Sequence, residues 1–335
     1  MNETLIKTGR IVTVFGGSGF IGRHVVRALA QDGWRVRVAT RRPDLAHHLQ
    51  PLGKAGQIQA VQANVRFPAS VVAAVRDADA VVNLVGIQVE SGAQTFEASH
   101  VAGARAIAEA ARDAGVTNFV LMSGIGVDEH SASPYVRSRA LGEAATLEAL
   151  PGAIILRPSV VFGPEDHFFN RFATLARFMM TLPLFGGGEA KMQPVYVGDV
   201  AKAVALALAG KAAAGTVYEL GGPRAMSVRE IMQFICDTIG RKRVLLPLPA
   251  AIGQFAAGVT ETMNRLGFGL YPPALLLTRD QAKLLGEDNV VSAEAVARGR
   301  TLEGLGISPE SVEAIVPGYL ARFRKSGQFE RPKAA

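Results

Sequence analysis

The chain has 335 residues, of which 49% are hydrophobic and 19% are charged, with a formal net charge of +7. This composition excludes intrinsic disorder, which requires few apolar residues and a high charge density. Cys236 is the single cysteine, which excludes a disulfide-stapled secreted scaffold. No uninterrupted apolar run of about 18 residues occurs, and the first residues lack a basic segment followed by an apolar one. Neither a membrane-spanning helix nor a secretory signal is therefore expected.

Short apolar runs alternate with amphipathic helical patterns in the first half of the chain. The sequence predicts strands at residues 11–15, 35–40, 58–63, 80–85, 119–122 and 153–156, and helices at residues 21–31, 70–76, 100–114 and 135–150. This alternation is typical of βαβ units, and strands buried on both faces have continuous apolar sequences, as these do. We therefore expect an α/β fold with a Rossmann-type, doubly wound parallel sheet.

The pattern changes after residue 163. We predict helices at residues 170–181 and 227–239, a strand and helix at 194–208, and a strand at 216–220. Ser227 and Glu230 have the spacing of a capping box. We expect a Rossmann domain at residues 10–163, to which 194–220 returns. A smaller, partly interleaved α/β domain would contain residues 164–193 and 221–325, followed by a basic tail at 326–335.

A glycine-rich segment lies between the first predicted strand and the first predicted helix. Gly16, Gly19 and Gly22 form a G-x-x-G-x-x-G pattern, with Phe20 and Ile21 in the same turn. Glycine is needed here because the backbone must turn tightly and let a pyrophosphate approach the helix N-terminus, where free amides and the helix dipole attract anions. The pattern alone also fits a flexible loop, but its strand–turn–helix context favours dinucleotide binding.

The second predicted strand ends in Thr40-Arg41-Arg42. NAD-binding folds usually place Asp or Glu here to accept hydrogen bonds from the ribose, whereas Arg fits a 2′-phosphate. A guanidinium binds phosphate through a fork of charge-assisted hydrogen bonds. The alternative is a solvated basic turn. We predict NADP(H) rather than NAD(H) as the cofactor.

These features resemble the short-chain dehydrogenase/reductase superfamily, in the extended or atypical branch that is similar to NAD-dependent epimerases and dehydratases. The resemblance implies further cofactor contacts near the adenine, after the fourth strand and over the nicotinamide. The corresponding residues are Asn64, Val65, Val85, Gly86, Pro158 and Val160.

Tyr135 and Arg139 occupy the positions of the family's Y-x-x-x-K pair. The resemblance implies that the tyrosine is the general acid/base, that the cation lowers the tyrosine pKa and holds the ribose, and that a serine orients the substrate. Arg139 replaces the lysine, and an arginine can hold the ribose but cannot relay protons. Ser123 lies near the family's serine, with Gly124 as the other candidate for that position. His100 stands where an asparagine is common.

Several segments are more specific than the glycine turn. They are Ser133-Pro134-Tyr135, Phe162-Gly163-Pro164-Glu165-Asp166, Phe169-Asn170, Gln193-Pro194-Val195-Tyr196-Val197-Gly198-Asp199-Val200, Leu246-Pro247-Leu248-Pro249 and Thr278-Arg279-Asp280-Gln281. They resemble the nucleotide-binding accessory subunits of respiratory complex I (NADH:ubiquinone oxidoreductase) and their bacterial relatives, from about residue 10 to residue 323. This resemblance implies a tightly bound, structural NADPH, a role in assembly, and docking on the peripheral arm near the membrane.

The segment from Arg241 to Leu285 begins with three basic residues and continues as a strongly apolar stretch. Its apolar residues with roughly helical spacing are Ile252, Phe255, Val259, Met263 and Leu266, followed by Leu270, Leu275, Leu276 and Leu277. A basic edge beside an apolar face fits an acidic partner or the headgroup zone of an anionic membrane. The alternative is a helical cap packed on its own domain.

Three other features have structural interpretations. Cys236 lies within a predicted helix and is expected to be a buried thiol. His47 and His48 have no third ligand nearby and are expected at the surface. Glu165-Asp166-His167 is expected to anchor a loop, because consecutive residues rarely point at one ion. No metal site is predicted.

The sequence therefore predicts a non-catalytic, NADPH-stabilised accessory subunit of respiratory complex I. It would lie peripherally on the cytoplasmic side of a bacterial inner membrane, with no nucleic-acid partner. The alternative is an NAD(P)-dependent epimerase, dehydratase or reductase that acts on a sugar or isoprenoid-like substrate, with Tyr135 as its base. A third hypothesis is a cofactor-sensing regulator.

Overall fold

The computed structural model describes residues 9–249, 253, 258, 278–325 and 327. Its contacts divide the chain into two compact units. The first contains Met1–Arg157 and Val200–Tyr218, and the second contains Pro158–Asp199 and Glu219–Ala335. The chain thus crosses between the units after residues 157, 199 and 218, where the sequence-based expectation placed the crossings after residues 163, 193 and 220.

A seven-stranded sheet forms the centre of the first unit, in the order β11-β6-β5-β4-β1-β2-β3. Its strands are β1 (Ile11–Phe15), β2 (Arg35–Thr40), β3 (Ile58–Gln62), β4 (Ala80–Asn83), β5 (Asn118–Met122), β6 (Ile154–Pro158) and β11 (Val217–Leu220). The pairs from β3 to β6 are parallel. Six of the strands have the 3-2-1-4-5-6 order of a Rossmann fold, so the predicted fold class is confirmed.

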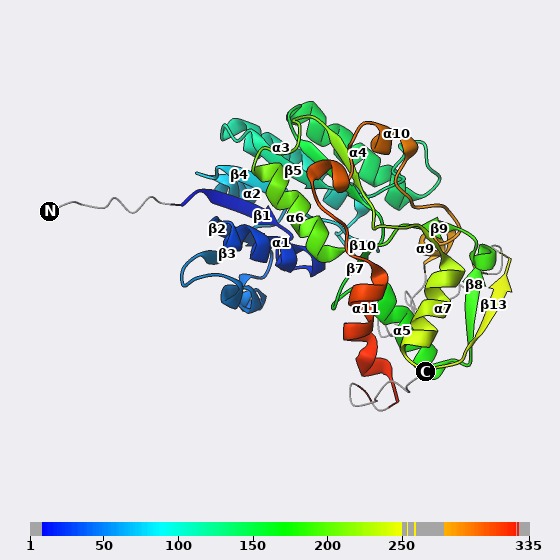
Figure 1. The fold of residues 1–335 in the computed structure, drawn as a ribbon. Helices are drawn as coiled ribbons and strands as arrows, with labels where there is room; N and C mark the ends of the chain where they lie inside the picture. Colours follow the sequence, from blue (N-terminus) through cyan, green and yellow to red (C-terminus); the bar gives the residue numbers. More distant parts are fainter. Residues whose placement is uncertain (1–8, 250–252, 254–257, 259–277, 326, 328–335) are drawn as a thin grey trace. The chain divides into compact units, whose positions relative to one another are not determined.

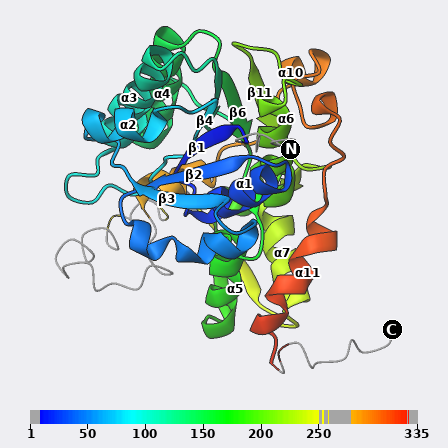
Figure 2. The same cartoon turned by 90° about the vertical axis from the view of Figure 1, so that its left-hand side faces the viewer.

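Helices cover both faces of this sheet. They are α1 (Phe20–Gln31), α2 (Pro68–Val75), α3 (Ala102–Asp113), α4 (Pro134–Ala149) and α6 (Val197–Leu208). Figures 1 and 2 show α2, α3 and α4 on one face and α1 and α6 on the other. The chain order reverses between β1 and β4, and ligands of such sheets bind at the carboxyl ends of the strands beside this switch point.

The strands are continuous apolar runs because both of their faces are covered. Val12, Val14 and Val82 have no exposed surface, and Phe119 and Ile155 are equally buried. The burial of apolar surface from two sides explains why strand positions could be predicted from sequence in this half of the chain.

The second unit contains α5 (Phe169–Phe178), α7 (Val228–Thr238), α9 (Arg279–Leu284), α10 (Ala293–Ala297) and α11 (Val312–Leu320). Its short strands are β7 (Val161–Phe162), β8 (Thr181–Phe185), β9 (Lys191–Met192), β10 (Val195–Tyr196), β12 (Met226–Ser227) and β13 (Val244–Leu248). The predicted capping box is present, since Ser227 Oγ accepts from the Glu230 N–H and the Glu230 carboxylate accepts from the Ser227 N–H.

The predicted helix at residues 170–181 is wrong at its end. The helix stops at Phe178, and Thr181–Phe185 forms strand β8, which pairs in parallel with β13. Leu182 and Leu184 are buried while Thr181, Pro183 and Phe185 are partly exposed, a period of two that belongs to a strand. Pro183 cannot donate the backbone hydrogen bond of a helix interior.

The apolar residues expected to form an interface between 252 and 277 lie outside the described residues, as does most of the predicted basic tail. Within the described residues, no helix combines the length and the apolar character needed to span a membrane.

Candidate functional site

The glycine turn lies between β1 and α1 and passes close to the end of β4. Gly16 has a positive φ of 76°, and a Cβ there would lie 3.0 Å from the carbonyl of Leu84. A Cβ at Gly22 would collide with the carbonyl oxygen of Gly16. Gly19 is the N-cap of α1 and offers no side chain to its amides, so the first amides of the helix, including those of Phe20 and Ile21, are left for a ligand.

The two arginines after β2 differ in their surroundings. Arg42 and Asp44 form a bidentate ion pair, with Nη2 2.7 Å and Nε 3.0 Å from carboxylate oxygens, and the guanidinium lowers the pKa of Asp44. Arg41 is exposed and has no hydrogen bond or ion pair with any described residue. Arg41 is therefore the better placed of the two to receive a phosphate. Sequence reasoning did not foresee that Asp44 holds Arg42.

Asn64 and Val65 follow β3. The Asn64 Oδ1 accepts from the N–H of Arg66 at 3.1 Å, which leaves the Asn64 amide NH₂ able to donate. Val65 packs against α3 so closely that a Cβ at Gly103 would lie 2.9 Å from its side chain. These contacts fix the turn at which the sequence predicts adenine binding.

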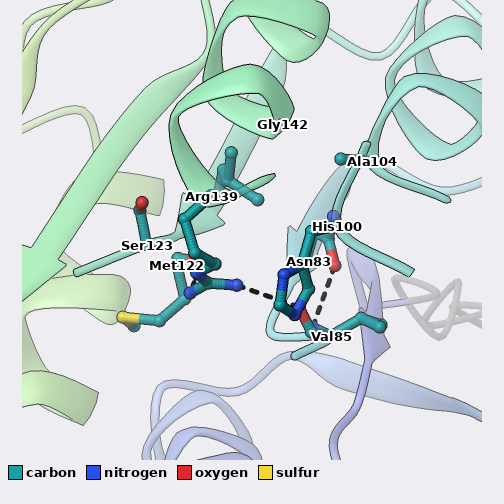
Figure 3. A pocket seen from close by; sticks show the side chains of 9 residues that line it. Asn83, Val85, His100, Ala104, Met122, Ser123, Arg139 and Gly142 are labelled. Carbon is teal, nitrogen blue, oxygen red and sulfur yellow. Dashed lines mark hydrogen bonds between the residues drawn. The ribbon is translucent and has the colours of Figure 1, made fainter. Parts of the chain in front are cut away.

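Arg139 points from α4 toward the ends of two strands (Figure 3). Its Nη1 donates to the Val85 carbonyl at 3.3 Å, and its Nη2 donates to the Met122 carbonyl at 2.8 Å. Its Nε is buried and has no partner among the described residues. Gly86 permits this approach, because a Cβ there would lie only 3.2 Å from Arg139 Nη1. The guanidinium thus ties α4 to the segment after β4 and to the last residue of β5.

His100 lies beside Arg139, on the π-helical turn Glu97–Val101. Its Nε2 accepts from the Ile87 N–H at 3.0 Å, so Nδ1 carries the proton and donates to Ser138 Oγ at 2.8 Å. Ser138 Oγ donates in turn to the Tyr135 carbonyl at 2.8 Å. Burial, and secondly the charge of Arg139, lower the pKa of His100 to about 3. The imidazole is neutral and both of its nitrogens are committed.

Sequence reasoning noted His100 only as a replacement for asparagine and did not place it among the site residues. The glycine at position 142 is the sequence feature that reflects the position of His100. A Cβ at Gly142 would collide with the His100 carbonyl oxygen. The glycine lets α4 approach the π-helical turn closely enough for Ser138 to reach the imidazole.

Tyr135 lies in the first turn of α4, where Ser133 Oγ accepts from the Val136 N–H. Its ring meets the rings of Phe96 and His100 edge-on, at 5.8 and 5.7 Å between centroids. Its hydroxyl has no hydrogen-bond partner among the described residues. The predicted pair, Tyr135 and Arg139, is therefore brought to the same end of the sheet.

Ser123 follows β5 and is buried. Its N–H donates to the Leu156 carbonyl at 2.7 Å, while its Oγ has no partner in the described part of the chain. It lines a cavity of about 10 Å³ whose other walls are Asn83, Val85, His100, Ala104, Leu121, Met122, Arg139 and Gly142. A space of this size accommodates about one water molecule, so any larger ligand lies outside it.

The first unit fits a nicotinamide dinucleotide on its own geometry. The glycine turn forms a cradle that side chains would fill, free amides begin α1, and the buried Ser123 Oγ and Arg139 Nε have unused hydrogen-bonding capacity. Pro158 and Val160, which the sequence also predicts as cofactor contacts, belong to the second unit.

The remaining candidates have structural roles. Asp166 anchors its loop by accepting from the N–H groups of Gly163 and Asn170 and from the Tyr319 hydroxyl, at 3.2, 3.2 and 2.6 Å. Burial raises the pKa of Asp166 and that of the Cys236 thiol. No group of three metal-ligating side chains occurs among the described residues.

Comparison with known proteins places the chain in a family. Residues 12–221 match the NAD dependent epimerase/dehydratase family, and the chain belongs to it. The structure of gox2253 superposes with a TM-score of 0.69 at 23% identity, covering 96% of this chain and all of that chain, which supports the fold. The cofactor class is a nicotinamide dinucleotide, as predicted.

Two relatives indicate the members of this family to which the chain is similar. The chain is 33% identical over 324 residues to NADH dehydrogenase [ubiquinone] 1 alpha subcomplex subunit 9, mitochondrial, of Arabidopsis thaliana, covering 96% of this chain and 79% of the relative. It is 34% identical over 268 residues to the ceramide reductase of Caulobacter vibrioides, covering 77% of this chain and 82% of the relative. The chain belongs to the branch of the family that contains the alpha subcomplex subunit 9 proteins, as its sequence motifs indicated.

The buried neutral state of His100 predicts a pH dependence of stability. The pKa of His100 falls from about 6.5 in the unfolded chain to about 3 in the folded protein, so only the unfolded state takes up this proton between these values. Stability is fully present above pH 6.5 and decreases as the pH falls toward 3, by up to about 1.4 kcal/mol per pH unit from this group. In urea unfolding between pH 7 and 4, His100→Asn should flatten the decline.

The matched control is His130→Asn, since the His130 side chain is 85% exposed and should leave the slope unchanged. An equally steep decline in His100→Asn and the wild type would contradict the assignment.

Proposed function

We propose that this protein is an accessory subunit of a respiratory NADH:ubiquinone oxidoreductase that holds a nicotinamide dinucleotide and does not transfer hydride itself. The observation that carries the proposal is Arg139, which replaces the lysine of the Y-x-x-x-K pair and donates to two backbone carbonyls. The relationship to the alpha subcomplex subunit 9 protein over 96% of the chain supports it.

The groups around Tyr135 are arranged for binding rather than for proton transfer. Reduction of a carbonyl requires a proton donor that is replenished after each turnover. A guanidinium keeps its proton, and both nitrogens of His100 are engaged by Ile87 and Ser138. Tyr135 and Arg139 would then hold the ribose beside the nicotinamide, and the buried Ser123 hydroxyl would reach the ligand through a water molecule in its cavity. When bound, the cofactor supplies a hydride donor for which this site provides no proton relay.

We further propose that the cofactor is NADPH, tightly bound. Gly16, Gly19 and Gly22 would seat the pyrophosphate, and Arg41 would bind the 2′-phosphate, with Arg42 joining only if it leaves Asp44. The exposed, unpaired guanidinium of Arg41 supports this assignment.

One end of the second unit is suited to docking. Exposed apolar side chains gather where α5 ends and β8 and β13 begin, namely Phe178 (78% exposed), Met179, Met180 (75%), Val244 (62%) and Leu246. The Val244 N–H donates to the Met180 carbonyl, so these residues lie on adjacent segments. Figures 1 and 2 show α5, α7 and α11 ending on the same side of the unit.

Cations surround these apolar residues. Arg243 Nε donates to the Ala176 carbonyl and Arg324 Nε to the Thr238 carbonyl, which brings the ends of α5, α7 and α11 together. The cations on these segments are Arg177, Arg241, Lys242, Arg243, Arg322, Arg324 and Lys325. Asp237 is the single carboxylate in the described segments 176–182, 237–246 and 321–325. This basic-apolar end would lie against partner subunits or anionic headgroups, with the protein peripheral on the cytoplasmic side of a bacterial inner membrane.

The 2′-phosphate contact is tested by Arg41→Ala. Loss of a charge-assisted hydrogen bond should raise the Kd for NADPH about tenfold and leave the Kd for NADH unchanged. Arg42→Ala is the control and should have the smaller effect, because Asp44 already engages that guanidinium. Equal losses for NADPH and NADH in Arg41→Ala, measured by calorimetry, would remove Arg41 from the phosphate site.

Membership in the complex is tested by affinity capture of the tagged protein from native membranes. We expect subunits of the oxidoreductase to co-purify, and a Phe178→Ser, Met180→Ser double variant to lose them because its apolar contact is lost. Leu45→Ser is the matched control, since Leu45 is 65% exposed on the first unit. Recovery of the wild type as a free soluble species, without respiratory subunits, would overturn the proposal.

A second candidate is an active NAD(P)-dependent reductase or epimerase. It is favoured by the tyrosine at position 135, which is the residue type of the Y-x-x-x-K pair, and by the 34% identity to ceramide reductase. This function predicts substrate-dependent oxidation of NADPH that Tyr135→Phe abolishes. The accessory-subunit proposal predicts no such turnover, with Tyr135→Phe changing cofactor affinity alone.

A further inference from the structure

The first unit holds an uncompensated cation at the carboxyl ends of its strands. Arg139 donates to two neutral carbonyl oxygens, and no carboxylate among the described residues forms an ion pair with it. The nine residues that line the adjacent cavity include no Asp or Glu. The guanidinium is partly buried, so water screens its charge less than at an open surface.

The positive charge of Arg139 contributes to lowering the pKa of the neighbouring His100. His100, which is only 3% exposed, is kept neutral by burial and by the charge of Arg139. The site therefore contains one fixed positive charge and opposes the introduction of a second.

We propose that Arg139 makes the site selective for the redox state of its cofactor, so that the reduced dinucleotide binds more tightly than the oxidised one. This inference rests on the proposed function, in which the nicotinamide half of the dinucleotide lies over the carboxyl ends of β4 and β5. The oxidised nicotinamide ring carries a positive charge and the reduced ring carries none. The phosphates, the riboses and the adenine are the same in both forms, so a difference in affinity reports the charge of the ring.

The size of the effect follows from Coulomb's law. Two unit charges several ångströms apart at an effective dielectric constant near 20 change the affinity on the order of tenfold to a hundredfold. By linkage, the reduction potential of the bound cofactor rises by about 30 mV for each tenfold preference for the reduced form.

Arg139 would thus be a specificity-determining residue whose effect differs from that of Arg41. Arg41 discriminates between cofactors by their 2′-phosphate and acts equally on both redox states. Arg139 discriminates between redox states and acts equally on cofactors with or without that phosphate.

The test is a calorimetric titration of the full chain, freed of nucleotide, with NADPH and with NADP⁺. The wild type should bind NADPH at least tenfold more tightly. In Arg139→Gln the ratio of the two Kd values should fall toward one, chiefly through tighter binding of NADP⁺, and Arg139→Lys should retain the preference. Arg137→Gln is the matched control, because Arg137 is an exposed cation on the same helix that donates to the Ser131 carbonyl.

Equal affinities for the two forms in the wild type, or an equal loss of both in Arg139→Gln, would overturn the inference while leaving the cofactor assignment intact. Binding of neither form by the wild type would overturn the proposed function itself. A second measurement needs no cofactor: in Arg139→Gln the ¹⁵N resonances of His100 should titrate at higher pH than in the wild type. An unchanged titration would show that the charge of Arg139 does not reach the site.

Discussion

The guanidinium of Arg139 connects three elements of the candidate site. Through the carbonyls of Val85 and Met122 it joins helix α4 to the segment after β4 and to the end of β5. A partly buried cation with only neutral acceptors has a desolvation cost that these hydrogen bonds offset in part. The same geometry explains why Gly86 has no side chain, and the charge of Arg139 adds to burial in lowering the pKa of His100. The Ile87 N–H fixes the tautomer in which His100 Nδ1 donates a hydrogen bond to Ser138 Oγ. An ammonium group has no planar fork with which to reach both carbonyls.

Close approach of backbone segments is the second requirement, and glycines at three places meet it. Gly22 lies against Gly16 in the phosphate turn, Gly142 against the His100 carbonyl, and Gly103 against Val65. The first contact would seat the dinucleotide in the proposed complex. The second holds α4 against the π-helical turn that precedes α3, and the third holds α3 against the segment after β3. Glycine positions therefore set the shape of the site as much as its polar side chains do.

Local patterns in the sequence were sufficient for the Rossmann half and less so for the rest. The run Ile11–Phe15 and the capping box of Ser227 and Glu230 are local signals, and both are confirmed. Strand β8 was missed because its partner, β13, lies about sixty residues away in the sequence and supplies the pairing that decides against a helix.

In the site, the glycine turn and the pairing of Tyr135 with Arg139 were predictable because each is a motif at fixed spacing. The ion pair of Arg42 with Asp44 and the hydrogen bonds of His100 were not. They depend on rotamers and on contacts between helices, which a residue pattern does not specify.

A site that binds a dinucleotide without proton transfer still contributes free energy to the fold. A ligand that binds only the native state stabilises it by RT ln(1 + [L]/Kd), about 2.7 kcal/mol when the free ligand is at a hundred times its Kd. In the proposed complex the dinucleotide would contact the glycine turn after β1, the residues after β4 and β5, and the first turns of α1 and α4. Those segments are far apart in sequence, so binding would oppose their separation. An arginine in place of a proton-relaying lysine does not weaken this stabilisation by the ligand, because the guanidinium still donates hydrogen bonds and still carries its charge. Under the proposed function, the cradle would therefore stabilise the fold without any hydride transfer in the site.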